Sequence, residues 1–176
     1  MRTVAALLTV FWLTACGGED PAGDIAAPES IDLSSPAFED GGTIPVELTC
    51  DGADVSPSLA WSGGPDATTY AITVVDPDAD GFVHWVAYGI PGSVASLQQG
   101  ELPDEAIQGT NDFDEAGYGG PCPPEGDEPH EYVLTIYALG TAPEDPPAAG
   151  NDLAAVLDAI SCCVAATGEL VGTFGR

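Results

Sequence analysis

Lysine is absent from this 176-residue chain, and arginine occurs only at positions 2 and 176. Against these two basic side chains stand 29 acidic ones, so the formal net charge is −27 at pH 7. Because neutralising phosphates requires lysine or arginine, this charge excludes nucleic acid as a partner. It also opposes electrostatic docking on anionic lipid, and we interpret the acidic residues as a solvated surface that keeps the protein soluble.

A long apolar run is also lacking. The run from Val4 to Leu13 is too short to span a bilayer, and with Arg2 before it the segment is typical of an export signal. Its ending, "LTAC", resembles a bacterial lipobox, in which Cys16 becomes the lipidated first residue of the mature protein. We therefore predict a signal peptide at 1–15 and a lipid anchor on the bacterial cell envelope, at its periplasmic or extracellular face. An ordinary secretory signal with a later cleavage site is the alternative.

Residues 16–33 are small, acidic and proline-bearing, with no apolar periodicity, and they predict a flexible tether. Residues 34–176 then have the length of one domain with a core of its own. Export also permits disulfides, although spacing alone does not assign the pairs among the four remaining cysteines: Cys50, Cys122, Cys162 and Cys163.

Short β-rich runs separated by Gly, Pro, Asp and Asn predict a mostly β fold with a largely antiparallel sheet. The runs are Thr43–Cys50, Ser58–Trp61, Thr69–Asp76, Phe82–Ile90, Glu131–Leu139 and Glu169–Phe174. One segment has helical spacing, with Asn151 as the expected N-cap and Leu153, Val156, Leu157 and Ile160 on one face. We expect this helix to pack against the sheet.

The stretch "DPDADG" at residues 76–81 resembles the first half of an EF-hand calcium loop, because its three aspartates alternate before a glycine. The twelfth position, however, is Ala87 instead of a bidentate glutamate, and the residues after Gly81 alternate like a strand. Calcium is therefore disfavoured, and the aspartates need another explanation.

Both histidines of the chain fall in this β framework. By alternation His84 shares a face with Val86, Tyr88 and Ile90, and His130 shares one with Tyr132, Leu134 and Ile136. Since the aspartate loop leads directly into the His84 strand, we predict that Asp76, His84 and His130 form one site. The alternative for each histidine is a hydrogen-bonded structural role.

Two other chemistries fit these residues less well. Two histidines and Asp76 suit zinc as ligand types, but their spacing is no recognised metal signature, and we predict no metal or cofactor. A hydrolase would use Ser56 or Ser58 with a histidine as base, yet the chain has no G-x-S-x-G elbow. We therefore do not expect an enzyme.

Six segments, in order and spacing, resemble the phosphatidylethanolamine-binding protein family, also called Raf kinase inhibitor-like proteins, in its bacterial branch. They are "IPVELTCDGADVSPSLAWSG", "YAITVVDPDADGFVHWVAYGIPG", "GTNDF", "GYGGPCPP", "HEYVLTIYALG" and "ELVGTFGR". The resemblance implies a large antiparallel sheet packed on a smaller one, with one or two short helices near the C-terminus. It also implies a small anion pocket, formed by Asp76, His84, His130 and Tyr132 and walled by the segment that begins with Gly120 and Pro121.

The same resemblance places the Cys50 and Cys122 loops near the pocket mouth and so implies a disulfide between them. Cys162 and Cys163 are adjacent, and are either free or joined in a vicinal bridge. Two positions depart from the family pattern. Asp80 stands where many relatives have a proline, and Glu131 replaces a basic residue, which lowers the positive potential near the pocket.

From these features we expect a non-enzymatic binding protein for a small anionic or zwitterionic ligand, such as one bearing phosphoethanolamine. The pocket would hold a phosphate or carboxylate through imidazole N–H groups, a tyrosine hydroxyl and backbone amides. Two alternatives stay open: a pocket retained without a physiological ligand, and an inhibitor or scaffold that acts on a protein partner through its surface.

Overall fold

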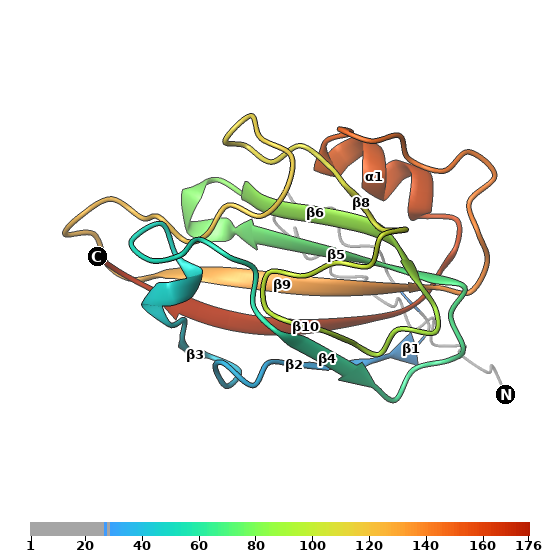
Figure 1. The fold of residues 1–176 in the computed structure, drawn as a ribbon, viewed down its shortest axis with the longest axis horizontal. Coiled ribbons are helices and arrows are strands. Elements are labelled where there is room, and N and C mark those ends of the chain that lie inside the picture. The colour runs from blue at the N-terminus through green and yellow to red at the C-terminus, as the bar shows by residue number, and fades with distance from the viewer. Residues whose placement is uncertain (1–26, 28) are drawn as a thin grey trace, which may run out of the picture.

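The computed structural model describes Ala27 and residues 29–176. The expected signal peptide and the lipidation site Cys16 lie outside the described residues. Two β-sheets lie face to face, and one α-helix covers the outer side of the larger sheet (Figure 1). No helix in this part of the chain has the length and apolar character needed to cross a bilayer.

The larger sheet has seven strands in the order β1-β10-β9-β5-β6-β8, with β3 also paired to β10, and the smaller sheet has the order β2-β4-β7. The long central pairs are antiparallel, whereas β1 and β3 run parallel to β10. The expected fold class is confirmed. The elements are β1 Glu29–Ser30, β2 Asp32–Ser34, β3 Gly42–Thr43, η1 Val46–Leu48, β4 Leu59–Ser62, β5 Thr69–Asp76, η2 Pro77–Ala79, β6 Phe82–Pro91, β7 Ser96–Leu97, β8 Ile107–Gln108, β9 His130–Leu139, α1 Leu153–Ile160 and β10 Val164–Phe174.

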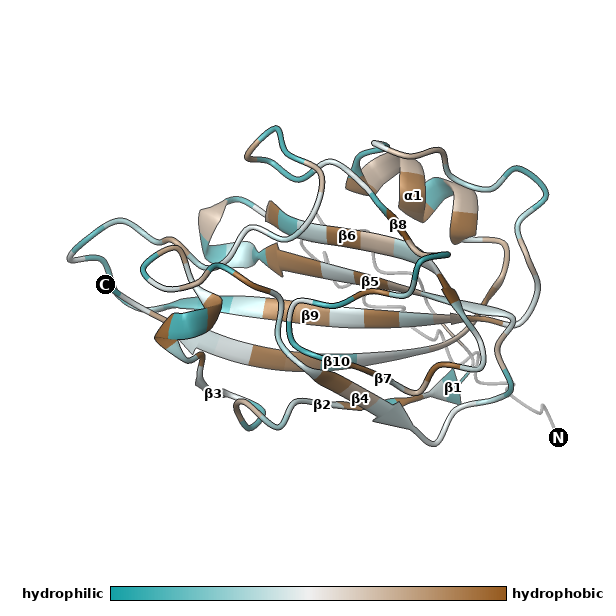
Figure 2. Ribbon diagram, in the orientation of Figure 1, coloured by the Kyte–Doolittle hydropathy of each residue, from teal (hydrophilic) through white to brown (hydrophobic). Residues whose placement is uncertain are grey.

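Two apolar clusters hold these layers together. The inter-sheet core joins side chains of both sheets, among them Trp61 of the small sheet and Trp85 and Leu134 of the large one. The helix-side core packs α1 against the other face of the large sheet. The long strands and α1 are accordingly banded with hydrophobic residues (Figure 2). Because β5, β6 and β9 are covered on both faces along most of their length, they hold the residues at their ends in a rigid frame.

The structure begins its sheets earlier than the sequence predicts. The sequence analysis assigned most of residues 29–34 to the tether. In the structure this segment forms β1 and β2, and the side chains of Ile31 and Leu33 are buried in the inter-sheet core. Gly168 of β10 makes this docking possible, because a Cβ there would lie 2.0 Å from the carbonyl oxygen of Ile31. Alternation over so few residues gave no usable signal.

Two local predictions were wrong. The run Thr43–Cys50 is not one strand: β3 ends at Thr43 and a 3₁₀ turn, η1, follows Pro45, whose ring fixes φ and removes the N–H that a ladder would need. The helix N-cap is Asp152 instead of Asn151, and its carboxylate accepts a hydrogen bond from Ala155 N at 2.9 Å.

Candidate functional site

Asp76 is the last residue of β5, and its two carboxylate oxygens contact two different neighbouring groups. Its Oδ1 accepts a hydrogen bond from Ala79 N at 3.1 Å and so caps the turn η2, while Oδ2 lies 2.8 Å from Nδ1 of His130. The residue is 2% exposed. Because a buried carboxylate must be hydrogen-bonded, this placement fixes the orientation of the His130 ring and directs its Nδ1 toward Asp76.

The "DPDADG" loop is a turn that joins β5 to β6 and is tied to β9. Asp78 Oδ2 accepts a hydrogen bond from Glu131 N at 2.8 Å. Asp80 and Gly81 both have positive φ, 56° and 79°, so Asp80 adopts a conformation that a proline, with φ near −65°, cannot reach. Within the described part of the chain, no group of three or more His, Cys, Asp or Glu side chains is arranged to hold a metal ion.

His84 lies on the other face of the sheet from the one that alternation predicts. Val74 pairs with Trp85 and Val75 pairs with Val83, so His84 is the extra residue of a β-bulge. It therefore turns toward Tyr132 on the inter-sheet side, whereas Val86 and Tyr88 belong to the helix-side core. A second register shift, where Gly89 has φ 70°, moves Ile90 to the inter-sheet core as well. In β9 the predicted alternation holds: Tyr132, Leu134 and Ile136 all lie in the inter-sheet core.

His84 is 3% exposed and is held by the loop that precedes the disulfide. Its Nδ1 donates to Gly119 O at 2.8 Å, and its own carbonyl accepts from Gly119 N at 2.9 Å. Burial lowers the pKa of His84 below its ordinary value of 6.5, and the Gly119 carbonyl and the charge of Asp76 oppose that shift in part. In its resting state the imidazole is thus a neutral ring whose Nδ1 is already committed.

Tyr132 is fully buried, and its hydroxyl lies near the Asp76 carboxylate and the Cys122 backbone without a hydrogen bond of good geometry to either. Its ring meets His84 edge to face, with centroids 5.2 Å apart. Burial, and next the charge of Asp76, raise the pKa of Tyr132, so the phenol stays protonated and can donate. A buried hydroxyl that makes no full hydrogen bond costs about 1–3 kcal/mol, and a group that accepts from it would recover that free energy.

The residues Gly119–Cys122, here called the wall segment, close one side of this group. Three contacts attach this part of the chain to the loop at residues 48–54. Tyr118 Oη donates to Leu48 O at 2.9 Å, Gly120 N donates to Asp54 Oδ1 at 2.6 Å, and Cys50 N donates to Pro121 O at 3.2 Å. The expected disulfide joins Cys50 to Cys122. Gly120 lies next to His84, and Pro121 lines a small cavity together with Tyr132.

Phe113 is a member of this group that the sequence analysis did not identify. It is 42% exposed and stacks edge to face on Phe82 and His84, with centroids 4.8 and 5.4 Å away. The buried Asn111 holds its loop, because Asn111 Oδ1 accepts from Phe113 N at 3.0 Å. An aromatic residue in a Gly-rich loop was the available signal, in the "GTNDF" segment.

The other residues singled out in the sequence analysis are not part of this group of side chains. In the described residues, neither Ser56 nor Ser58 is hydrogen-bonded through its hydroxyl to a histidine. Glu131 is exposed and points away from Tyr132, as alternation predicts, so it does not enter the site. Cys162 and Cys163 form a vicinal disulfide at the end of α1, far in sequence from the histidines.

The assembled group is thus a pair of histidines, each anchored through Nδ1, beside a buried phenol and a loop with backbone amides. Residues 34–175 match the sequence model of the family described as phosphatidylethanolamine-binding protein, and this chain belongs to that family. Members of the family are generally binding proteins and not catalysts.

Individual relatives agree with that assignment. A Mycobacterium tuberculosis protein named "Putative lipoprotein LppC" is 41% identical over 150 residues, which cover 84% of this chain and 74% of the relative. A UPF0098 protein of Methanothermobacter thermautotrophicus is 40% identical over 154 residues, covering 83% of this chain and 99% of that protein. The crystal structure of Escherichia coli YbcL, described as a new member of the mammalian PEBP family, superposes with a TM-score of 0.76 at 35% identity, covering 84% of this chain and 99% of that one.

Proposed function

We propose that the protein binds a small ligand through a phosphate or carboxylate group held by His84, His130 and Tyr132, with the wall segment, including Gly120 and Pro121, closing one side of the site. The observation that carries this proposal is that His84, His130 and the buried Tyr132 hydroxyl gather around the buried Asp76, and that this hydroxyl makes no hydrogen bond of good geometry. An anionic oxygen would accept from the phenol and remove the cost of its isolation.

The histidines would supply the positive charge. Since Nδ1 of His84 donates to a carbonyl and Nδ1 of His130 faces a carboxylate, the protonated rings would offer their Nε2–H groups to the ligand. Arg176, the one other basic side chain in the described residues, is bound to Asp51 and Glu125. Binding of an anion should therefore be coupled to histidine protonation and should strengthen as the pH falls.

A zwitterion suits the site better than a bare anion. The chain carries a net charge of −27, which repels anions beyond contact range, although screening limits that repulsion to about 10 Å in ordinary salt. A ligand with an ammonium group near its phosphate, as in phosphoethanolamine, lowers this repulsion. Because the same negative charge gives no attraction to anionic lipid, attachment to the envelope would depend on the lipid on Cys16 alone. The name of the mycobacterial relative is consistent with such an anchor.

Isothermal titration calorimetry tests the proposal with phosphoethanolamine, inorganic phosphate and calcium as separate titrants between about pH 5.5 and 8. His84→Ala and His130→Ala should each weaken phosphoethanolamine binding by about 1–3 kcal/mol, the range for a charge-assisted hydrogen bond. Tyr88→Phe is a matched control, because Tyr88 packs on the helix side of the sheet. Binding that both histidine variants retain would refute the proposal, as would binding of calcium alone.

A further inference from the structure

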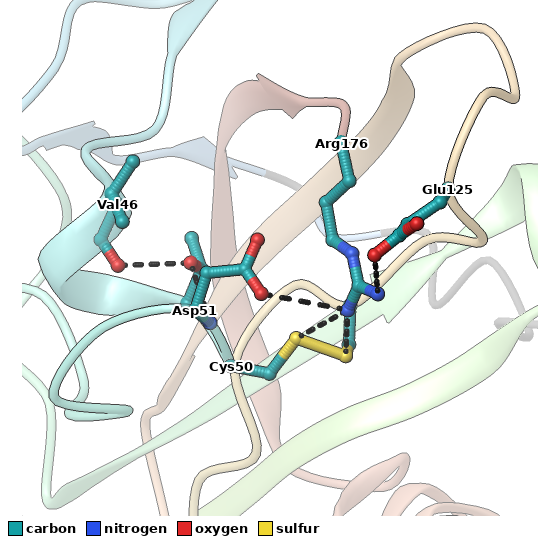
Figure 3. A network of polar contacts seen from close by, with 7 residues as sticks. Val46, Cys50, Asp51, Glu125 and Arg176 are labelled. Atoms are coloured by element: carbon teal, nitrogen blue, oxygen red, sulfur yellow. Dashed lines mark hydrogen bonds and ion pairs between the residues drawn. A yellow bond between two sulfur atoms is a disulfide. The ribbon is translucent and has the colours of Figure 1, made fainter.

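The guanidinium of Arg176 lies directly on the Cys50–Cys122 disulfide (Figure 3). Its Nη1 is 3.1 Å from Cys50 Sγ and 3.0 Å from Cys122 Sγ. Two carboxylates hold the guanidinium there: Asp51 Oδ1 lies 3.6 Å from Nη1 and Glu125 Oε1 lies 3.7 Å from Nη2. The single arginine of the described residues thus contacts both sulfur atoms.

A neutral disulfide gains little from this contact, because its sulfurs are weak hydrogen-bond acceptors. A thiolate gains much more, since it is an anion and a nearby arginine lowers the pKa of a cysteine thiol. The acidic surroundings make the contrast larger. Without Arg176, a thiolate at either sulfur would face Asp51 and Glu125 with no compensating charge. Arg176 is therefore expected to stabilise a thiolate at this site more than it stabilises the disulfide.

We propose that Cys50–Cys122 is a thiol–disulfide exchange site for a dithiol reductant, and that Arg176 stabilises the thiolate that the exchange releases. Cys122 is exposed and Cys50 is half-buried, so an incoming thiolate attacks Cys122 Sγ. The Sγ–Sγ bond breaks and its electron pair leaves on Cys50 Sγ, in contact with Nη1. The second thiolate of the reductant then attacks the mixed disulfide and releases Cys122.

In this exchange the protein gains two electrons, the reductant becomes a disulfide, and the two protons of its thiols pass to solvent or to the new cysteine thiols. The structural consequence falls on the wall segment. Reduction removes the covalent link between Cys122 and the 48–54 loop and leaves Pro121 with a single backbone hydrogen bond to Cys50. Because Gly119 O holds His84, a looser wall segment should change the environment of the His84 ring.

Equilibration of the full-length mature protein in mixtures of reduced and oxidised dithiothreitol at pH 8 tests the exchange. After alkylation, mass spectrometry reports the Cys50–Cys122 bond separately from Cys162–Cys163. Arg176→Gln should lower the equilibrium constant for reduction at least about tenfold, which corresponds to about 30 mV for a two-electron couple. Arg176→Lys keeps the charge and should retain most of the wild-type value. Ala154→Glu is the control: it adds a negative charge on the exposed side of α1 and should change the equilibrium constant for reduction little.

Two further measurements separate this role from a merely structural one. In the reduced protein, the alkylation rate of the exposed Cys122 should titrate at a lower pH in wild type than in Arg176→Gln. The NMR signals of the two histidines should show a change at His84 on reduction. Equal reduction constants for wild type and Arg176→Gln would overturn the proposal. So would a disulfide that stays oxidised in excess dithiothreitol while Cys162–Cys163 is reduced.

Discussion

Replacing Tyr132 with phenylalanine should stabilise the fold and weaken ligand binding at the same time. The Tyr132 hydroxyl is buried and makes no hydrogen bond of good geometry, although it lies near Asp76 and the Cys122 backbone, so the free protein bears part of its desolvation cost, at most about 1–3 kcal/mol. Phenylalanine keeps the ring and its edge-to-face contact with His84 but removes that cost. The free energy of unfolding should therefore rise by up to about 1–3 kcal/mol, or roughly 2–4 °C in Tm for each kcal/mol in a chain of this size.

Binding should change in the opposite direction, because the phenol O–H is one of the proposed donors to the ligand. Its loss should weaken phosphoethanolamine binding by about 1.5–3 kcal/mol, the range for a hydrogen bond to a charged group. Urea unfolding and calorimetry on the same preparations measure both effects. Tyr88→Phe is the control: the Tyr88 hydroxyl donates to Ala148 O, so its removal should destabilise the fold by about 0.5–1.5 kcal/mol and leave binding unchanged. If Tyr132→Phe destabilises the protein as Tyr88→Phe does, the reasoning fails.

Three other predictions concern pH, the turn and the anchor. The pKa of His84 is lowered in the folded state, so as the pH falls the unfolded chain takes up the proton first. The free energy of unfolding should therefore be highest above about pH 6.5 and decrease below it. Urea unfolding from pH 8 to 5.5 should show this decrease in wild type and a smaller one in His84→Asn. Asp80→Pro should destabilise the fold by more than about 1 kcal/mol, because proline cannot adopt a φ of 56°. Asp80→Gly should be tolerated, since glycine adopts positive φ freely. Thermal unfolding of both variants measures the difference. Cys16→Ala, if exported, should leave the domain in the soluble fraction after cell lysis, and its persistence in the membrane fraction would contradict anchoring by lipid alone.

The sequence by itself determined the fold class, the strands β5, β6 and β9 and the position of the helix, but only the second half of β10. These elements are long enough for periodicity to register: β5, β6, β9 and α1 each repeat their apolar pattern over eight residues or more. The shortest elements could not be predicted, because they contain too few residues for a periodic pattern to be detected. The strands β1, β2 and β3 have two or three residues each, and their pairing is decided by contacts with distant segments, such as the close approach of Ile31 to Gly168.

At the site, the motifs named the residues, but the tertiary structure decided what each of them does. Alternation assigns His84 to the wrong face, because a bulge depends on the register of two paired strands and one added residue reverses the direction of a side chain. That reversal brings His84 to the buried Tyr132 on the inter-sheet side. The contact of Arg176 with the Cys50–Cys122 disulfide likewise joins residues 126 and 54 positions apart, a separation over which sequence spacing carries no geometric information.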